Sequence, residues 1–168
     1  WPRPARFKRK LLDANGLMGA NGFMGDYRQC ALLSASDLVE IDAAHAVVTE
    51  ELNNFGTGPD RFGLMHNDFL PENLLRDGEQ LNIIDFDDCG MGWHMMDMAT
   101  LLFFLVGEPQ YELAHDNFLA GYRSRRALPD EHVAMLPMFL FARCLSYLGW
   151  AASRPDMDAM AHNIRHLL

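Results

Sequence analysis

Side chains that can bind cations or move protons gather in the middle of the chain. They lie in the segments GLMHNDFLPENLL and NIIDFDDCG, and are His66, Asp68, Asn73, Asp85, Asp87 and Asp88. One amide oxygen and one carboxylate, with waters and phosphate oxygens, commonly hold Mg²⁺ in phosphoryl-transfer sites. The residue types therefore indicate magnesium-dependent chemistry on a phosphate group.

A β-hairpin is expected to bring two of these side chains together. Asp77–Gly78 is a hairpin turn signal between two apolar runs. A two-residue turn there pairs Asn73 with Asn82, and a four-residue loop pairs it with Ile84. Either register leaves Asp85 within about three residues, or roughly 10 Å, of the position opposite Asn73. We therefore expect Asn73 and Asp85 to share a hard cation.

Asp68 is the candidate general base. It lies five residues before Asn73, on the loop that leads into the same strand. Phosphoryl transfer needs a carboxylate that orients the attacking hydroxyl and accepts its proton. The role of Asp88 stays open between a second metal position, a substrate contact, a cap of the loop and a plain surface aspartate.

The order of these residues resembles the catalytic loop and metal-binding triplet of protein-kinase-like enzymes. The resemblance covers His66-Asn67-Asp68 with Asn73, then Asp85-Phe86-Asp87, and continues to Asp97-Met98-Ala99. The match is to the small-molecule branch. The segment is similar to the aminoglycoside phosphotransferase and choline kinase family, including bacterial homoserine-kinase-like and stress-response-kinase-like members.

The resemblance implies a role for each matching residue. It implies Asp68 as catalytic base, Asn73 and Asp85 as Mg²⁺ ligands, and ATP as co-substrate. It also implies that His66 supports the loop and that Asp97 braces the loop from beneath. The implied activity is ATP-dependent phosphorylation of a small-molecule hydroxyl.

Two departures and one gap limit the resemblance. Asn67 stands where protein kinases usually carry arginine, and Asp87 replaces the glycine of the usual triplet. No Gly-rich strand-turn-strand and no strand lysine for the phosphates precede residue 62. We therefore expect residues 1–168 to be a C-terminal catalytic lobe without its nucleotide lobe, inactive alone and prone to self-association through the face left bare.

The elements around this centre are mostly helical. Apolar residues recur at spacings of three and four after Ser34, which predicts a helix ending near Gly56. Residues 1–33 predict irregular structure with at most one short helix, and 62–66 and 81–84 predict strands. Further helices are expected over 94–106, 109–125, 130–153 (kinked at Pro137) and 156–167. The fold class is mainly α with a small β-hairpin or sheet, as in the C-terminal lobe of a protein-kinase-like fold.

Composition narrows the function classes. A net charge of −9 argues against nucleic-acid binding and suits a cationic small substrate. The one basic cluster, from Arg3 to Lys10, is interpreted as a solvated face. The three cysteines match neither a disulfide framework nor a zinc site, which favours the cytoplasm. The apolar stretch from Met135 to Ala152 contains Pro137, Arg143 and Ser146, which favours a buried helix and no membrane contact.

Other functions remain open at this point. A metal-dependent phosphohydrolase would use His66, Asp68, Asp85 and His94 as ligands. A protein Ser/Thr kinase of the stress-response type and a non-catalytic binding module are further alternatives. The acceptor is also open, because the acidic residues Glu108, Glu112 and Asp116 suit either an amine-binding site or a solvated helix face.

Overall fold

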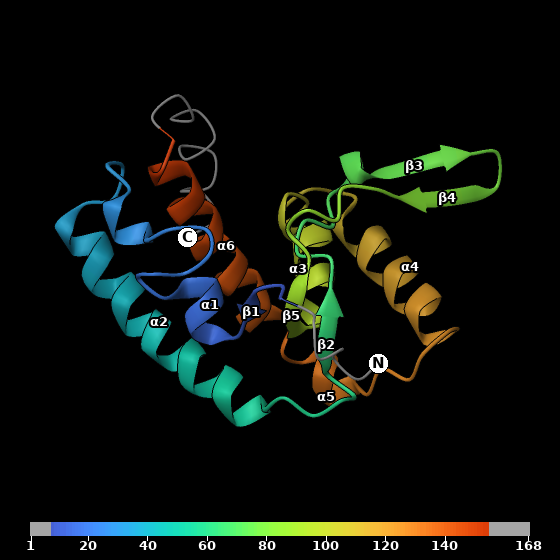
Figure 1. Ribbon diagram of the computed structural model, residues 1–168, viewed down its shortest axis with the longest axis horizontal. Helices are drawn as coiled ribbons and strands as arrows, with labels where there is room; N and C mark the ends of the chain where they lie inside the picture. Colours follow the sequence, from blue (N-terminus) through green and yellow to red (C-terminus); the bar gives the residue numbers. More distant parts are fainter. Residues whose placement is uncertain (1–7, 155–168) are drawn as a thin grey trace.

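Helices form most of the structure, a computed structural model that describes residues 8–154 (Figure 1). The helices predicted over 34–56, 94–106 and 109–125 are confirmed to within a few residues, and the one over 156–167 lies outside the described residues. The observed bounds are α1 (Ala14–Met18), α2 (Ala35–Phe55), α3 (Met95–Phe103), α4 (Tyr111–Arg123), α5 (Asp130–Val133) and α6 (Leu136–Ala152), with 3₁₀ turns η1 (Tyr27–Gln29) and η2 (Pro71–Asn73).

Two small sheets accompany the helices. One has the strand order β1-β5-β2, with β1 parallel and β2 antiparallel to β5, and the other is the hairpin β3-β4. The strands are β1 (Leu11–Leu12), β2 (Phe62–Met65), β3 (Leu74–Asp77), β4 (Gln80–Ile83) and β5 (Gly90–Trp93). The predicted fold class is confirmed, whereas β1 and β5 were not predicted.

The amino-acid composition of β5 does not predict a strand. Its sequence is GMGW, and glycine is depleted in strands. Neighbouring backbone leaves no room for side chains there: a Cβ added to Gly90 would lie 2.9 Å from the Lys10 carbonyl oxygen, and one added to Gly92 3.0 Å from that of Leu12. Close backbone approach therefore selects glycine at both positions.

Helix α2 follows the expected pattern closely. The Ser34 hydroxyl accepts from the Asp37 N–H and the Asp37 carboxylate accepts from the Ser34 N–H, which forms a capping box. Gly56 ends the helix with φ 75°, a left-handed value that suits glycine. The residues that α2 buries are Ile41, Val48 and Leu52.

The single helix predicted over 130–153 is two helices. The helix is interrupted between Val133 and Leu136, and Pro137 lies in the first turn of α6. Proline lacks an N–H and is tolerated in a first turn, so the predicted kink becomes a break just before it. By length and composition Asp130–Ala152 could cross a membrane, but 56% of its apolar window is buried against the rest of the protein, as in a core helix.

The hairpin turn falls one residue later than predicted. Asp77 pairs with Gln80, so the two-residue loop is Gly78–Glu79 and not Asp77–Gly78. The Ile84 N–H donates to the Asn73 carbonyl oxygen at 3.0 Å. Asn73 therefore lies opposite Ile84, in one of the two predicted registers, and Asp85 follows directly.

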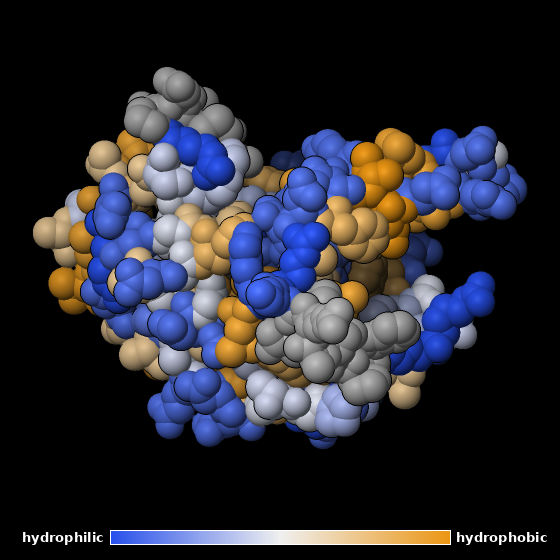
Figure 2. Space-filling view, in the orientation of Figure 1, coloured by the Kyte–Doolittle hydropathy of each residue, from blue (hydrophilic) through white to orange (hydrophobic). Residues whose placement is uncertain are grey.

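The two faces of the hairpin differ in what they cover. Alternation places Leu74 and Leu81 on one face, where they line a cavity of about 630 Å³ together with Phe118 of α4. Figure 2 shows hydrophobic side chains at the base of the hairpin and a hollow beneath it. The other face carries Leu75 and Ile84, which are 50% and 41% exposed. An exposed apolar surface therefore adjoins Asn73.

Candidate active site

Asp97 holds the loop that joins β2 to η2. It lies in the first turn of α3, where its Oδ2 accepts from the His66 N–H at 2.8 Å and its Oδ1 from the Asn67 N–H at 2.7 Å. Asn67 has φ 67°, a left-handed conformation that asparagine tolerates better than most residues. Burial raises the pKa of Asp97, while the two donated hydrogen bonds act in the opposite direction. The contacts place Asp97 beneath the loop, at the position expected of a brace.

His66 links this loop to the end of the hairpin. Its Nε2 lies 2.8 Å from the Ile84 carbonyl oxygen, and its Nδ1 lies 3.3 Å from the Asp68 backbone nitrogen. This pattern assigns the proton to Nε2 and makes Nδ1 an acceptor. Both ring nitrogens are engaged, so His66 has no free nitrogen for a metal.

Asp68 and Asn73 contact each other directly. The Asn73 Nδ2 donates to the Asp68 backbone oxygen at 2.8 Å and to its carboxylate Oδ2 at 3.0 Å. The amide nitrogen of Asn73 is thus used by Asp68, which leaves its Oδ1 free to face a cation. The Asp68 side chain is 27% exposed, so a hydroxyl can reach it.

The aspartates after β4 occupy an exposed turn. Asp85 has φ 61° and no side-chain hydrogen bond within residues 8–154. Asp88 forms an ion pair with Lys10 at 3.6 Å, and Arg9 Nη1 donates to the Asp87 carbonyl oxygen at 2.7 Å. Part of the basic cluster interpreted as a solvated face therefore contacts the turn that carries Asp85. The ion pair does not decide among the four roles left open for Asp88.

Sequence reasoning missed one residue of this centre. Arg143 of α6 is fully buried, and its Nη2 lies 3.6 Å from Asp68 Oδ1. A lone arginine in an apolar helix is almost never fully buried without a partner. A buried partner could therefore be expected for Arg143, but the sequence alone does not identify the carboxylate that contacts it.

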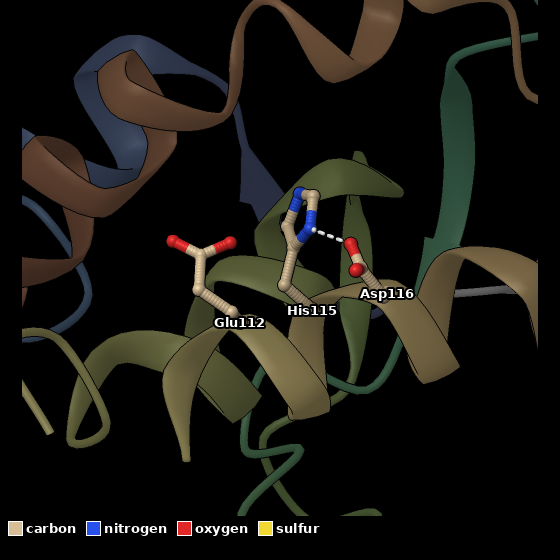
Figure 3. Close-up of side chains that lie close together, drawn as sticks. All are labelled: Glu112, His115 and Asp116. Carbon is tan, nitrogen blue, oxygen red and sulfur yellow. Dashed lines mark hydrogen bonds and ion pairs between the residues drawn. The ribbon is translucent and has the colours of Figure 1, made fainter. Parts of the chain in front are cut away.

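Two acidic residues of α4 lie beside a histidine on the surface of the helix. Glu112, His115 and Asp116 hold their donor atoms within 4.8 Å of one another (Figure 3). Glu112 and Asp116 are exposed, and Asp116 bonds to His115 at 3.0 Å. Neither Glu112 nor Asp116 is directed into the cavity described above. The arrangement fits a solvated helix face.

Comparison with known proteins decides the family. The model of the phosphotransferase enzyme family matches residues 16–134, which include the loop, the hairpin and α4. The chain belongs to this family. A match of that extent places the catalytic-loop resemblance inside a phosphotransferase domain, and it agrees with the kinase-like interpretation of the motifs.

Three of the proteins that this chain resembles are named as kinases. A solved microcompartment-associated aminopropanol kinase superposes with TM-score 0.85 at 34% identity, covering 98% of this chain and 54% of its own. A solved amicoumacin kinase with AMP-PNP, Ca²⁺ and Ami gives TM-score 0.71 at 22% identity, a likeness of fold. The amicoumacin kinase of Bacillus subtilis is 24% identical over 127 residues, which are 70% of this chain and 38% of that protein.

A further relative has no assigned function. A protein of Deinococcus radiodurans is 34% identical over 98 residues, which are 55% of this chain and 29% of that protein. The chain spans about half the length of the solved relatives that it matches.

His94 lies apart from the cluster formed by Asp68 and Asn73. It lines the cavity under the hairpin, and its ring lies where a Cβ on Gly63 would be 2.8 Å away. Burial, aided by the charge of Arg126, lowers the pKa of His94 to about 4. The phosphohydrolase interpretation needed both His66 and His94 as ligands, and neither is placed for that role.

The lowered pKa of His94 predicts an acid sensitivity. The unfolded state binds a proton near pH 6.5 and the folded state only near pH 4, so the stability contribution is complete above pH 6.5 and is lost as pH falls towards 4. As the pH falls from 6.5 to 4, we expect the free energy of unfolding to decrease less in His94→Asn than in the wild type. Urea unfolding at pH 7 and pH 4.5 measures the difference, and equal losses in both proteins would contradict it.

Removal of the Asp97 carboxylate is expected to destabilise the loop from His66 to Asn73. Asp97→Ala leaves the N–H groups of His66 and Asn67 without their acceptor, and an unsatisfied buried donor costs about 1–3 kcal/mol. We expect a loss of about 2–4 kcal/mol in the free energy of unfolding. Urea denaturation measures it, with the exposed Asp116→Ala as control. A change within about 0.5 kcal/mol, as for ordinary surface substitutions, would show that Asp97 does not stabilise the loop.

Proposed function

We propose that the full-length protein transfers the γ-phosphoryl group of ATP to a hydroxyl of a small molecule. The observation that carries this proposal is the contact between Asp68 and Asn73. One side chain is a partly exposed carboxylate suited to accept a proton, and the other keeps an amide oxygen free beside it. Phosphoryl transfer needs a base and a metal site next to each other but separate.

The residues present fit a magnesium ion. Asn73 Oδ1 and the Asp85 carboxylate are hard oxygen donors without hydrogen-bond partners within residues 8–154. The bond from the Ile84 N–H to the Asn73 carbonyl oxygen holds Asn73 opposite the residue before Asp85. Mg²⁺ is usually bound by one or two protein oxygens plus phosphates and waters. When bound, the ion neutralises charge on the phosphate oxygens. Asp68 meanwhile orients the acceptor hydroxyl and takes its proton.

The hairpin face that carries Leu75 and Ile84 suits a nucleotide base or the remainder of the protein. Leu75 and Ile84 share the face of Asn73 and are about half exposed, at 50% and 41%. Exposed apolar patches beside polar site residues commonly mark ligand or partner contacts. The same face would account for self-association of a fragment that lacks its partner lobe.

An amino alcohol is the acceptor class that we favour. The net charge of −9 suits a cationic substrate, and the aminopropanol kinase is a relative at 34% identity. Aminoglycoside-like compounds are the second class to test. A protein substrate tests the alternative that the protein is a Ser/Thr kinase of the stress-response type.

A substrate screen tests the proposal. The full-length protein is incubated with Mg²⁺ and ATP and with amino alcohols, aminoglycosides or a generic protein substrate, and ADP release is followed above the rate without acceptor. We expect stimulation by one or more amino alcohols. Stimulation by the protein substrate alone would replace the small-molecule proposal, and no stimulation by any acceptor, with ATP bound, would favour a binding module.

A further inference from the structure

Arg143 is a buried cation beside Asp68 that the reaction described above does not use. Its side chain is 0% exposed, and a buried guanidinium is costly unless it is paired and hydrogen-bonded. The loop from His66 to Asn73 contains no lysine or arginine. Within residues 8–154, the only cation that forms an ion pair with Asp68 is Arg143, which belongs to a different element, α6.

One nitrogen of Arg143 is held towards Asp68. Its Nη2 donates to the Tyr147 hydroxyl at 3.0 Å and lies 3.6 Å from Asp68 Oδ1. Arg143 and Tyr147 are four residues apart on α6 and so share one helix face. The guanidinium carbon lies 4.2 Å from the centre of the Tyr147 ring, which restricts the guanidinium further.

The other two guanidinium nitrogens of Arg143 are buried without hydrogen-bond partners, which lowers the stability of the folded state. Its Nε and Nη1 have no hydrogen-bond partner within residues 8–154, and neither do the two side-chain polar atoms of buried Asn67. Buried polar atoms are nearly always paired, and replacing a whole buried ion pair by apolar residues is often neutral or stabilising. Stability alone therefore does not explain an arginine here, and unpaired donors beside a reactive carboxylate point to a functional reason.

We infer that Arg143 is a positioning residue for the carboxylate of Asp68. This inference rests on the proposed function. Arg143 approaches Oδ1 from α6 while the Asn73 amide binds Oδ2 from η2, so each oxygen has its own partner. Two partners on separate elements fix the plane of the carboxylate and leave its remaining lone pairs for the acceptor hydroxyl. Without Arg143 the carboxylate can rotate about its side-chain torsions.

Substitution of Arg143 in the full-length protein tests the inference. A misplacement of about 1 Å can cost about 10²-fold in rate, so we expect Arg143→Met to lower kcat about 100-fold with the KM for ATP changed less than about threefold. Arg143→Lys keeps the charge and should recover part of that loss. Asp68 is 27% exposed, so water can solvate its carboxylate once the cation is gone, and the urea midpoint of Arg143→Met should change little. Arg123→Met, which breaks a surface pair with Asp130, is the control and should resemble the wild type.

A second measurement is independent of activity. The side-chain amide of Asn73 donates to Asp68, so its exchange with solvent reports on the carboxylate by ¹⁵N NMR. We expect faster exchange in Arg143→Met and no change in Arg123→Met. A loss of kcat no larger than the loss of folded protein would assign Arg143 a structural role only. If the wild type phosphorylates no acceptor, the proposed function fails separately, and unchanged Asn73 exchange in Arg143→Met would then overturn the inference.

Discussion

Asp68→Asn in the full-length protein is expected to lower kcat by about 10²–10⁴-fold, the usual contribution of a general base. The amide keeps the size of the carboxylate but cannot accept the proton of the acceptor hydroxyl. A base acts mainly in the transition state, so the KM for ATP should change little. Steady-state kinetics with a saturating acceptor measure both constants.

The control for Asp68→Asn is the same change at an exposed position of the hairpin. Asp77 ends β3 and pairs with Gln80, away from the loop. Asp77→Asn should retain wild-type kinetics. Near-normal turnover in Asp68→Asn, with both variants folded, would show that the carboxylate of Asp68 is not the base.

Asp85→Ala is expected to abolish Mg²⁺-dependent binding of ATP. Loss of an outer-shell contact already costs about 10–100-fold in metal affinity, so loss of a ligand should weaken productive binding more than about 100-fold. Asp85 has φ 61°, where alanine is strained but asparagine is tolerated. Asp85→Asn therefore separates loss of the negative charge from backbone strain, and it should bind nearly as poorly as Asp85→Ala.

Calorimetric titration of ATP with and without Mg²⁺ measures this effect. His94→Asn serves as the matched metal control, because His94 lines the cavity under the hairpin and not the surface beside Asn73. Its metal dependence should equal that of the wild type. Loss of metal dependence in His94→Asn but not in Asp85→Asn would restore the hydrolase interpretation.

The local pattern of the sequence predicts much of this structure. The period of Leu38, Ile41 and Val48 is that of a helix with one buried face, and α2 has that form. The two candidate registers of the hairpin included the observed one. Short-range chemistry and a repeating apolar pattern are sufficient for α2 and the hairpin. The loop from His66 to Asn73 was recognised by its motif, but its backbone N–H groups bond to the distant Asp97.

Contacts between distant segments could not be predicted in the same way. β5 is recognisable only when β1 and β2 lie beside it, because its glycines are selected by neighbouring backbone. Arg143 and Lys10 meet Asp68 and Asp88 across the fold. A single charged residue carries no periodic pattern, so its partner is decided by tertiary packing.

A crystal structure of the full-length protein with Mg²⁺ and a non-hydrolysable ATP analogue tests the central claim most directly. The account predicts a Mg²⁺ ion about 2.0–2.1 Å from Asn73 Oδ1 and from an Asp85 oxygen. It also predicts that Asp68 is outside the metal shell and faces the γ-phosphate with its carboxylate. A metal ion bound by Asp68 or His66, or a nucleotide bound without contact to Asn73 and Asp85, would contradict the account.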